Sequence, residues 1–247
     1  MALTIKLDNV SKKYDNFVAL KNMDLKIHSG EIFAYMGPNG AGKTTTINLI
    51  LGLLNPSSGI LRVLGENPYL DTDEVYEVKN QVGFLLDQDS LNPKLSGFKN
   101  ILYWAELYDI VSQNIVERVN EVIAIVNLTK WKDVLVEKYS HGMKKRLLFA
   151  RGIVHNPQIL ILDEPTSGID LESKVLMRNL IKKFADENKT VFFSSHDLEE
   201  VQKVCTNLAI INKGEKIFDG TLNELKDKYP DYTFEDIYLK LTSGTEA

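Results

Sequence analysis

The sequence predicts an α/β fold, with a sheet core, an antiparallel β layer near the N-terminus and an inserted helical subdomain. Three patterns support this class. Leu3, Ile5 and Leu7 alternate with polar residues, and residues 25–27 repeat that period, as half-buried antiparallel strands do. Residues 32–36 (IFAYM) form an unbroken apolar run, typical of a strand buried on both faces. The middle of the chain instead repeats its apolar residues at helical spacing.

The remaining elements are expected in chain order. Residues 44–54 (TTTINLILGLL) predict a helix directly after the apolar run. Two helical faces are expected next, formed by Ile101, Trp104, Ala105 and Tyr108 and by Ile115, Val119, Val122, Ile123 and Val126. Ser140 is the expected N-cap of a third helix. Strands return at residues 159–162 and 191–193, each followed by a helix, and a hairpin is expected to turn at Lys213–Gly214.

These elements predict one domain over residues 1–247. The α/β core with its antiparallel layer is expected at residues 1–87 and 156–247, and the helical subdomain at residues 88–155. A chain of this length that is 44% apolar can bury a substantial core.

Composition narrows the class of partner. The net charge of −5 argues against nucleic-acid binding, which usually shows as a strong basic excess. Cys205 is the single cysteine, so it forms no internal disulfide; we expect a small buried side chain in a reducing compartment. The first residues lack the apolar segment of a signal peptide, and no run approaches the ~20 apolar residues that span a bilayer. If the protein acts at a membrane, we expect another chain to cross it.

A glycine-rich loop follows the buried strand and precedes a helix, which is the context that a phosphate-binding loop requires. Its residues fit G-x-x-x-x-G-K-[ST] and are followed by Thr45; they are Gly37, Pro38, Asn39, Gly40, Ala41, Gly42, Lys43 and Thr44. Backbone N–H groups of such a loop and the helix N-terminus bind phosphate oxygens. We expect Lys43 to reach the β- and γ-phosphates and the Thr44 hydroxyl to hold Mg²⁺. The core is therefore predicted to be a P-loop NTPase core.

A second apolar strand, residues 159–162, delivers two acidic residues at its carboxyl end, where open α/β sheets place their ligands. Asp163 is expected to bind the Mg²⁺ that bridges the β- and γ-phosphates. Glu164 follows directly and is expected to polarise the attacking water. An apolar run before an acid is a weak motif alone, but the pairing with the phosphate loop is specific.

Further along the chain, three more motifs carry a resemblance to a known family. YSHGMKKR begins at Tyr139, LDEPTSGID ends at Asp170, and SSHDLEEV contains His196. In this order, with the phosphate loop, the chain resembles the nucleotide-binding subunits of ABC transporters over nearly its whole length. YSHGM is similar to that family's LSGGQ signature.

The resemblance implies a head-to-tail dimer in which ATP held by one phosphate loop is covered by the signature of the other chain. Ser140 and the backbone at Gly142 would then contact the γ-phosphate across the interface. Tyr14 matches the aromatic residue that stacks on adenine. His196 matches the family's γ-phosphate histidine, with Asp170 as its partner through the dimer.

The sequence departs from the family pattern at two places. The family has a glutamine directly after one of its strands. In this sequence Asp87 stands at that position and Gln88 follows it, and either side chain could be a ligand of Mg²⁺. His141 replaces the first signature glycine; we expect a negative φ there, with the imidazole pointing away from the site. The run Lys144–Arg146 is expected to form a solvated face.

The resemblance implies an ATPase that drives a separate integral membrane permease from the cytoplasmic face of the cell membrane, with ATP and Mg²⁺ as cofactors. Its dimer partner is a second copy or a homologous ATPase subunit. The closing segment is similar to the tail of exporters that pair with ABC-2 type permeases, which favours export. Two alternatives stay open at this point: an ATPase acting on ribosomes or DNA, which a single cassette with a compact insert disfavours, and a non-hydrolysing regulatory subunit.

Overall fold

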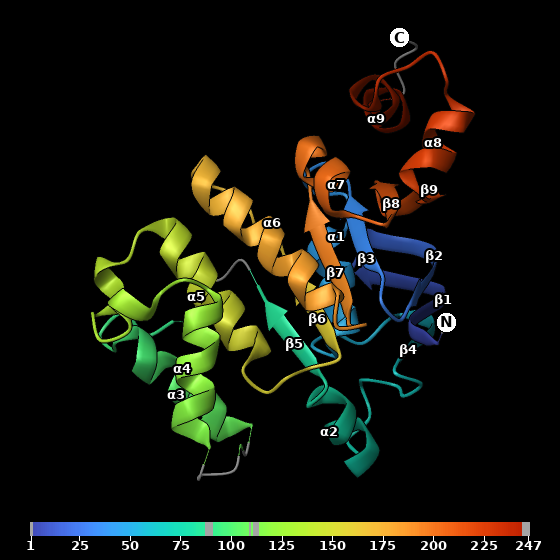
Figure 1. Cartoon of the computed structure of the whole chain (residues 1–247). Helices are drawn as coiled ribbons and strands as arrows, with labels where there is room; N and C mark the ends of the chain where they lie inside the picture. Colours follow the sequence, from blue (N-terminus) through green and yellow to red (C-terminus); the bar gives the residue numbers. More distant parts are fainter. Residues whose placement is uncertain (1, 87–90, 109, 111–113, 244–247) are drawn as a thin grey trace.

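A six-stranded sheet organises the chain (Figure 1). The structure is a computed structural model that describes residues 2–86, 91–108, 110 and 114–243. The strand order is β5-β6-β7-β3-β8-β9. In chain order these strands are β3 (Ile32–Met36), β5 (Val82–Leu85), β6 (Ile159–Leu162), β7 (Thr190–Ser195), β8 (Asn207–Asn212) and β9 (Glu215–Gly220). All pair in parallel except β9, which returns from β8 through the predicted turn at Lys213–Gly214.

Strand β3 lies inside this sheet and is buried on both faces, as its apolar run predicts. Ile32, Ala34 and Met36 belong to the core cluster that the helices cover. Phe33 and Tyr35 belong to a second cluster on the opposite face. Successive side chains of a strand point to opposite faces, so a strand between two apolar layers needs apolar residues at every position.

The opposite face packs against a three-stranded antiparallel sheet of order β2-β1-β4. Its strands are β1 (Leu3–Tyr14), β2 (Phe17–His28) and β4 (Ser58–Val63). Ile5 and Leu7 are buried as predicted, but the prediction for Leu3 is wrong, since Leu3 is 39% exposed. Thr4 is buried in its place and donates a hydrogen bond to the carbonyl oxygen of Ile27. The pairing register shifts between Leu3 and Ile5, which breaks the alternation that the sequence suggests.

Helix α1 packs in the core between the two sheets, and further helices cover the other face of the large sheet. The predicted helix after the glycine loop is confirmed as α1, although it ends earlier than expected. The helices outside the middle of the chain are α1 (Lys43–Ile50), α2 (Asp73–Lys79), α6 (Leu171–Ala185), α7 (Leu198–Val204), α8 (Leu222–Lys228) and α9 (Phe234–Ser243). Cys205 follows α7 and is partly rather than fully buried; burial raises the pKa of its thiol to about 12.

Three helices from the middle of the chain stand together beside the β5 edge of the large sheet (Figure 1, green to yellow). They are α3 (Gly97–Leu107), α4 (Ile115–Ile125) and α5 (His141–Ile153), with short 3-10 turns at Thr129–Trp131 and Val136–Lys138. The predicted faces of α3 and α4 supply buried core residues, including Ile101 and Val119. Ser140 caps α5 as predicted by accepting a hydrogen bond from the backbone N–H of Met143. The predicted α/β class, with an antiparallel layer and a helical insert, is confirmed.

Candidate nucleotide site

The glycine-rich loop joins the carboxyl end of β3 to the start of α1, and its backbone geometry depends on glycine. Gly42 has a φ of +110° at the N-cap of α1, and Gly40 has a φ of +78°. L-residues rarely adopt these angles. A Cβ atom at Gly42 would also lie 2.8 Å from the carbonyl oxygen of Ala19 in β2. The loop is therefore held against the antiparallel sheet.

This geometry predicts that Gly42→Ala destabilises the fold more than Gly40→Ala does. Both variants carry the strain of a positive φ, about 1–3 kcal/mol, but only Gly42 has a backbone atom in the way, since nothing lies within 4 Å of a Cβ at Gly40. We expect the melting temperature of G42A to fall by several degrees more than that of G40A in thermal unfolding. Equal losses in the two variants would contradict the packing contact with Ala19.

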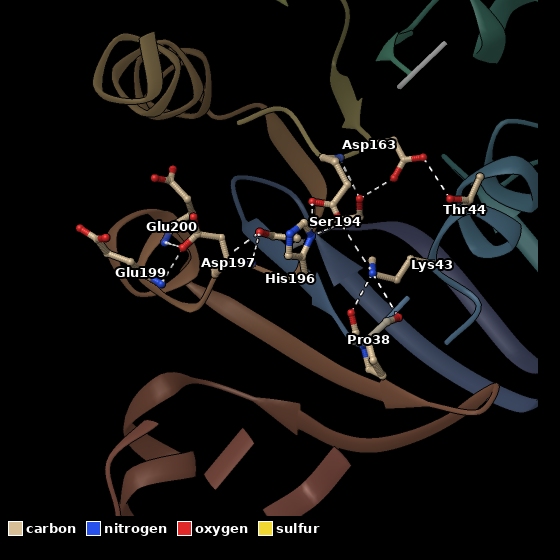
Figure 2. Close-up of polar contacts among 12 residues, drawn as sticks. Pro38, Lys43, Thr44, Asp163, Ser194, His196, Asp197, Glu199 and Glu200 are labelled. Atoms are coloured by element: carbon tan, nitrogen blue, oxygen red, sulfur yellow. Dashed lines mark hydrogen bonds and ion pairs between the residues drawn. The ribbon is translucent and has the colours of Figure 1, made fainter. Parts of the chain in front are cut away.

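The ammonium group of Lys43 folds back over the loop (Figure 2). Its Nζ donates hydrogen bonds to the carbonyl oxygens of Gly37 at 2.7 Å and Pro38 at 3.3 Å. It also lies 3.5 Å from the Glu164 carboxylate, and the Lys43 side chain is 8% exposed. A positive charge is thus placed beside the backbone N–H groups at the start of α1, which has no side-chain cap of its own. The loop and Lys43 together therefore form a binding site for an anion.

Asp163 leaves the carboxyl end of β6 and is 4% exposed. Its Oδ2 accepts a hydrogen bond from Thr44 Oγ1 at 3.2 Å, and its Oδ1 accepts one from Ser194 Oγ at 2.5 Å (Figure 2). Its backbone N–H donates to the carbonyl oxygen of Leu85 at the end of β5. Contacts from α1, β5 and β7 therefore fix this carboxylate in place.

Glu164 turns sharply out of the strand with a φ of +48°, a strained value for a residue with a Cβ. Ser194 Oγ accepts a hydrogen bond from the Glu164 backbone N–H at 2.9 Å, and Lys145 Nζ donates to the Glu164 carbonyl oxygen at 3.3 Å. The carboxylate then meets His196, whose Nδ1 lies 2.9 Å from Oε2 and 3.0 Å from Oε1. Glu164 is thereby held between Lys43 and His196.

Two of the residues that hold Glu164 were missed or misread from the sequence. Ser194 was not singled out, although the parallel pairing of β6 with β7 places the end of β7 beside the acidic pair. Lys145 was expected on a solvated face, and this prediction is wrong because its side chain is 3% exposed. Helix α5 packs into the core on most of its sides, so a basic residue on it must turn inward. Arg146 is also partly buried and donates to the carbonyl oxygen of Val126.

The loop and the acidic pair border one cavity of about 690 Å³. Predicted residues that line it are Pro38, Asn39, Gly40, Gly42, Lys43, Thr44, Thr45, Asp163 and Glu164. Gly37 and Ala41 belong to the loop but do not line the cavity. Tyr14, expected to stack on adenine, lies at the end of β1 outside the lining, whereas Phe17 lines it and is 63% exposed. The adenine contact of Tyr14 stays a prediction, and Phe17 is the aromatic residue that sequence reasoning missed in the same hairpin.

The signature residues stand apart from this cavity. Ser140 and His141 are exposed at the N-terminus of α5, and Gly142 is buried so closely against α6 that a Cβ there would lie 2.2 Å from Ser173 Oγ. His141 starts the helix and is not among the residues with positive φ, so the expected negative φ is confirmed. Within one chain Asp170 caps α6 and accepts hydrogen bonds from Ser173. Its expected pairing with His196 across a dimer stays a prediction. Asp87 and Gln88 lie outside the described residues.

The residues at the acidic end of the cavity fit a magnesium ion. The Thr44 hydroxyl and the Asp163 carboxylate are hard oxygen donors 3.2 Å apart. Within the described residues, no cluster of three or more acidic, histidine or cysteine side chains could enclose a metal. Mg²⁺ is usually bound in this way, through one or two protein oxygens together with substrate phosphates and water.

Comparison with known proteins agrees with this geometry. Residues 20–167 match the family model described as ABC transporter. The chain is 35% identical to Nod factor export ATP-binding protein I of Cupriavidus metallidurans over 92% of its length and 74% of that protein's. It is 34% identical to the bacitracin transport ATP-binding protein BcrA of Bacillus licheniformis over 96% of its length and 76% of that protein's.

Solved structures show the same similarity. The dimeric ABC transporter cassette MJ0796 superposes with a TM-score of 0.81 at 28% identity, covering 88% of this chain and 98% of that one. The same cassette in a post-hydrolysis dimer bound to ADP and Pi superposes with a TM-score of 0.80, with the same identity and coverage. The phosphate loop and the acidic pair border one cavity, and His196 lies outside its lining but contacts Glu164. With the matches above, we conclude that the chain belongs to the ABC transporter family as one of its ATP-binding, ATP-hydrolysing subunits.

Proposed function

We propose that this protein hydrolyses Mg-ATP in the cavity at the glycine-rich loop and thereby drives an exporter. The observation that carries the proposal is that Lys43 and His196 both contact Glu164. The Glu164 carboxylate lies 3.5 Å from Lys43 Nζ and 2.9 Å from His196 Nδ1. A charged cradle for phosphate and a positioned base are the two parts that phosphoryl transfer to water needs. The relatives named for Nod factor export and bacitracin transport support the exporter assignment.

Each residue of the cavity has a proposed role in this reaction. The loop from Gly37 to Thr45 binds the triphosphate through its backbone, and Lys43 exchanges its two loop carbonyls for β- and γ-phosphate oxygens. Glu164 accepts the proton of the attacking water, and His196 orients Glu164 and contacts the γ-phosphate. Thr44 and Asp163 would hold Mg²⁺, with Asp87 or Gln88 as a further ligand, and the ion would supply positive charge against the phosphates. Tyr14 stacks on adenine.

The active form is proposed to be a head-to-tail dimer in which Ser140 and Gly142 contact the triphosphate bound by the other chain. Both residues lie outside the cavity of their own chain, at an α5 N-terminus where Ser140 is exposed. Helix N-termini attract anions. The dimeric state of the similar cassette supports this arrangement. Association of the two chains would depend on ATP, because groups from both chains would neutralise each triphosphate.

The dimer is tested by placing a negative charge at position 140, where Ser140 has none. Asp and Asn replace Ser at an N-cap with little loss of stability, so S140D and S140N should both fold, and they differ by a single negative charge. In an E164Q background with Mg-ATP, we expect S140N to pair in size-exclusion chromatography with light scattering and S140D to stay monomeric while still binding ATP. If S140D pairs as well as S140N does, the γ-phosphate does not lie beside Ser140.

The membrane partner is proposed to be an integral permease that the ATPase contacts from the cytoplasmic side. None of the helices in the described part of the chain has the length and apolar character that a bilayer crossing requires. A second cavity, of about 270 Å³, lies between the end of α1, the end of α2, β5 and α3, and we call it the side groove. It is lined by residues 50–53, Val63, Pro68, residues 78–80, Val82, Phe84 and Tyr108. An apolar groove of this kind suits a short helix of the permease.

A further inference from the structure

Arg151 is among the largest side chains that the structure buries completely, with 2% of its surface exposed. It projects from α5, and its guanidinium carbon lies 4.8 Å from the ring centre of Trp104 and 5.2 Å from that of Phe84. Its Nη2 donates a hydrogen bond to the carbonyl oxygen of Phe84 at 3.2 Å. Burial lowers the pKa of the guanidinium to about 10, so the group stays charged at neutral pH.

The two rings come from different parts of the fold. Phe84 lies in β5 of the α/β core, and Trp104 lies in α3 of the helical insert. The rings meet edge to face with their centres 6.3 Å apart, and the guanidinium contacts both. Helix α5 is held closely to the strand here, because a Cβ at Gly83 would lie 1.9 Å from the carbonyl oxygen of Gly152. Arg151 therefore joins β5 to α3 through its contacts with both.

Strand β5 also reaches the nucleotide cavity. The carbonyl oxygen of Leu85 accepts the hydrogen bond of the Asp163 backbone N–H at 2.7 Å, and Leu86 lines the cavity. In the other direction, Phe84 and Tyr108 line the side groove. Tyr108 follows α3, and its ring lies 6.4 Å from that of Trp104. The contacts of Arg151 thus adjoin both the site of phosphate chemistry and a groove on the outer surface.

A buried arginine is a costly way to join two packed elements, since apolar side chains of similar volume usually stabilise a core as well or better. Its planar fork does what an apolar residue cannot, because it presents two faces to aromatic rings while donating along its edge to a carbonyl. These contacts favour one relative orientation of β5 and α3. We therefore expect Arg151 to fix the orientation of α3 relative to β5 more than it stabilises the fold.

We propose that Arg151 is a positioning residue that couples nucleotide occupancy, sensed at the carboxyl end of β5, to the placement of α3 beside the side groove. The inference rests on the proposed function, because it requires ATP in the cavity. Coupling between two sites is reciprocal. A partner bound at the side groove would therefore change the affinity of the cavity for ATP through the same residue.

Hydrogen–deuterium exchange of the protein without its membrane partner tests this coupling, with Mg-ATP as the probe and E164Q as the background. We expect Mg-ATP to slow exchange at least fivefold both in the loop, residues 37–45, and in α3, residues 97–107. In R151M and in W104L, loop protection should remain while the slowing in α3 falls below twofold. Because Trp104 is only partly buried, we expect W104L to fold. W104L therefore tests the proposal even if R151M does not fold.

The matched control is Arg118→Met. Arg118 is a partly buried arginine of α4 that donates to the carbonyl oxygens of Ile153 and Val154 and to Glu121. These partners all belong to the helical insert rather than to β5. R118M should keep the nucleotide response of α3. Retained α3 protection in R151M and W104L, or its equal loss in R118M, would overturn the role of Arg151. Absence of loop protection in E164Q itself would instead overturn the proposed function.

Discussion

Replacing Glu164 with glutamine is expected to stop ATP hydrolysis while leaving ATP binding intact. Ser194 holds the strained backbone of Glu164 and His196 contacts its carboxylate, so the carboxylate is placed to accept a proton. An amide of the same shape cannot accept one. Loss of a positioned base typically lowers kcat by about 10²- to 10⁴-fold. Phosphate release gives kcat and KM, and calorimetry gives the ATP affinity, which we expect to change little.

The same variant should accumulate a dimer in the presence of Mg-ATP, because the contacts across the interface persist when the γ-phosphate is not removed. Glu215→Gln is a matched control, since Glu215 is an exposed carboxylate paired with Lys21 at 2.6 Å. E215Q should hydrolyse ATP at the wild-type rate. Normal turnover in E164Q would show that another group activates the water.

Replacing Lys43 with alanine is expected to have the second large effect, on binding itself. Its ammonium group is held beside the loop by two neutral carbonyls, and a bond to a phosphate oxygen would add the attraction between opposite charges. Truncating one partner of a buried charged contact typically costs about 2–5 kcal/mol. We therefore expect the Kd for Mg-ATP to rise by about 30-fold or more, measured by isothermal titration calorimetry.

Lys21→Ala serves as the control for this variant, because Lys21 is the other half of the exposed pair with Glu215. K21A should bind Mg-ATP as the wild type does. A K43A protein that unfolds at the wild-type temperature and still binds ATP with wild-type affinity would show that the triphosphate is not held at this loop. Its thermal unfolding is therefore measured alongside its affinity.

Much of the site could be predicted from the sequence because the relevant contacts are local. The loop from Gly37 to Thr44 is one continuous segment whose glycines and flanking elements define its conformation. Asp163 and Glu164 are likewise placed by the strand that precedes them. The α5 cap at Ser140 and the turn at Lys213–Gly214 depend only on neighbouring residues.

The errors concern contacts between distant segments. Ser194 holds the acidic pair only because β7 lies next to β6 in the sheet, and strand order is not written in either segment. Lys145 turns inward because α5 is enclosed by the core. Leu3 is exposed because an irregular register shifts the end of β1 against β2. In each case the neighbour, rather than the residue's own pattern, decided the outcome.

The sequence by itself determined that this chain can bind a triphosphate, since periodicity and short motifs encode secondary structure and the loop that follows β3. Only the tertiary structure decided how Glu164 is held between Lys43 and His196, and that Arg151 lies between the rings of Phe84 and Trp104. The physical reason is that burial and charge pairing depend on which surfaces meet in space. Those surfaces belong to segments that are far apart along the chain.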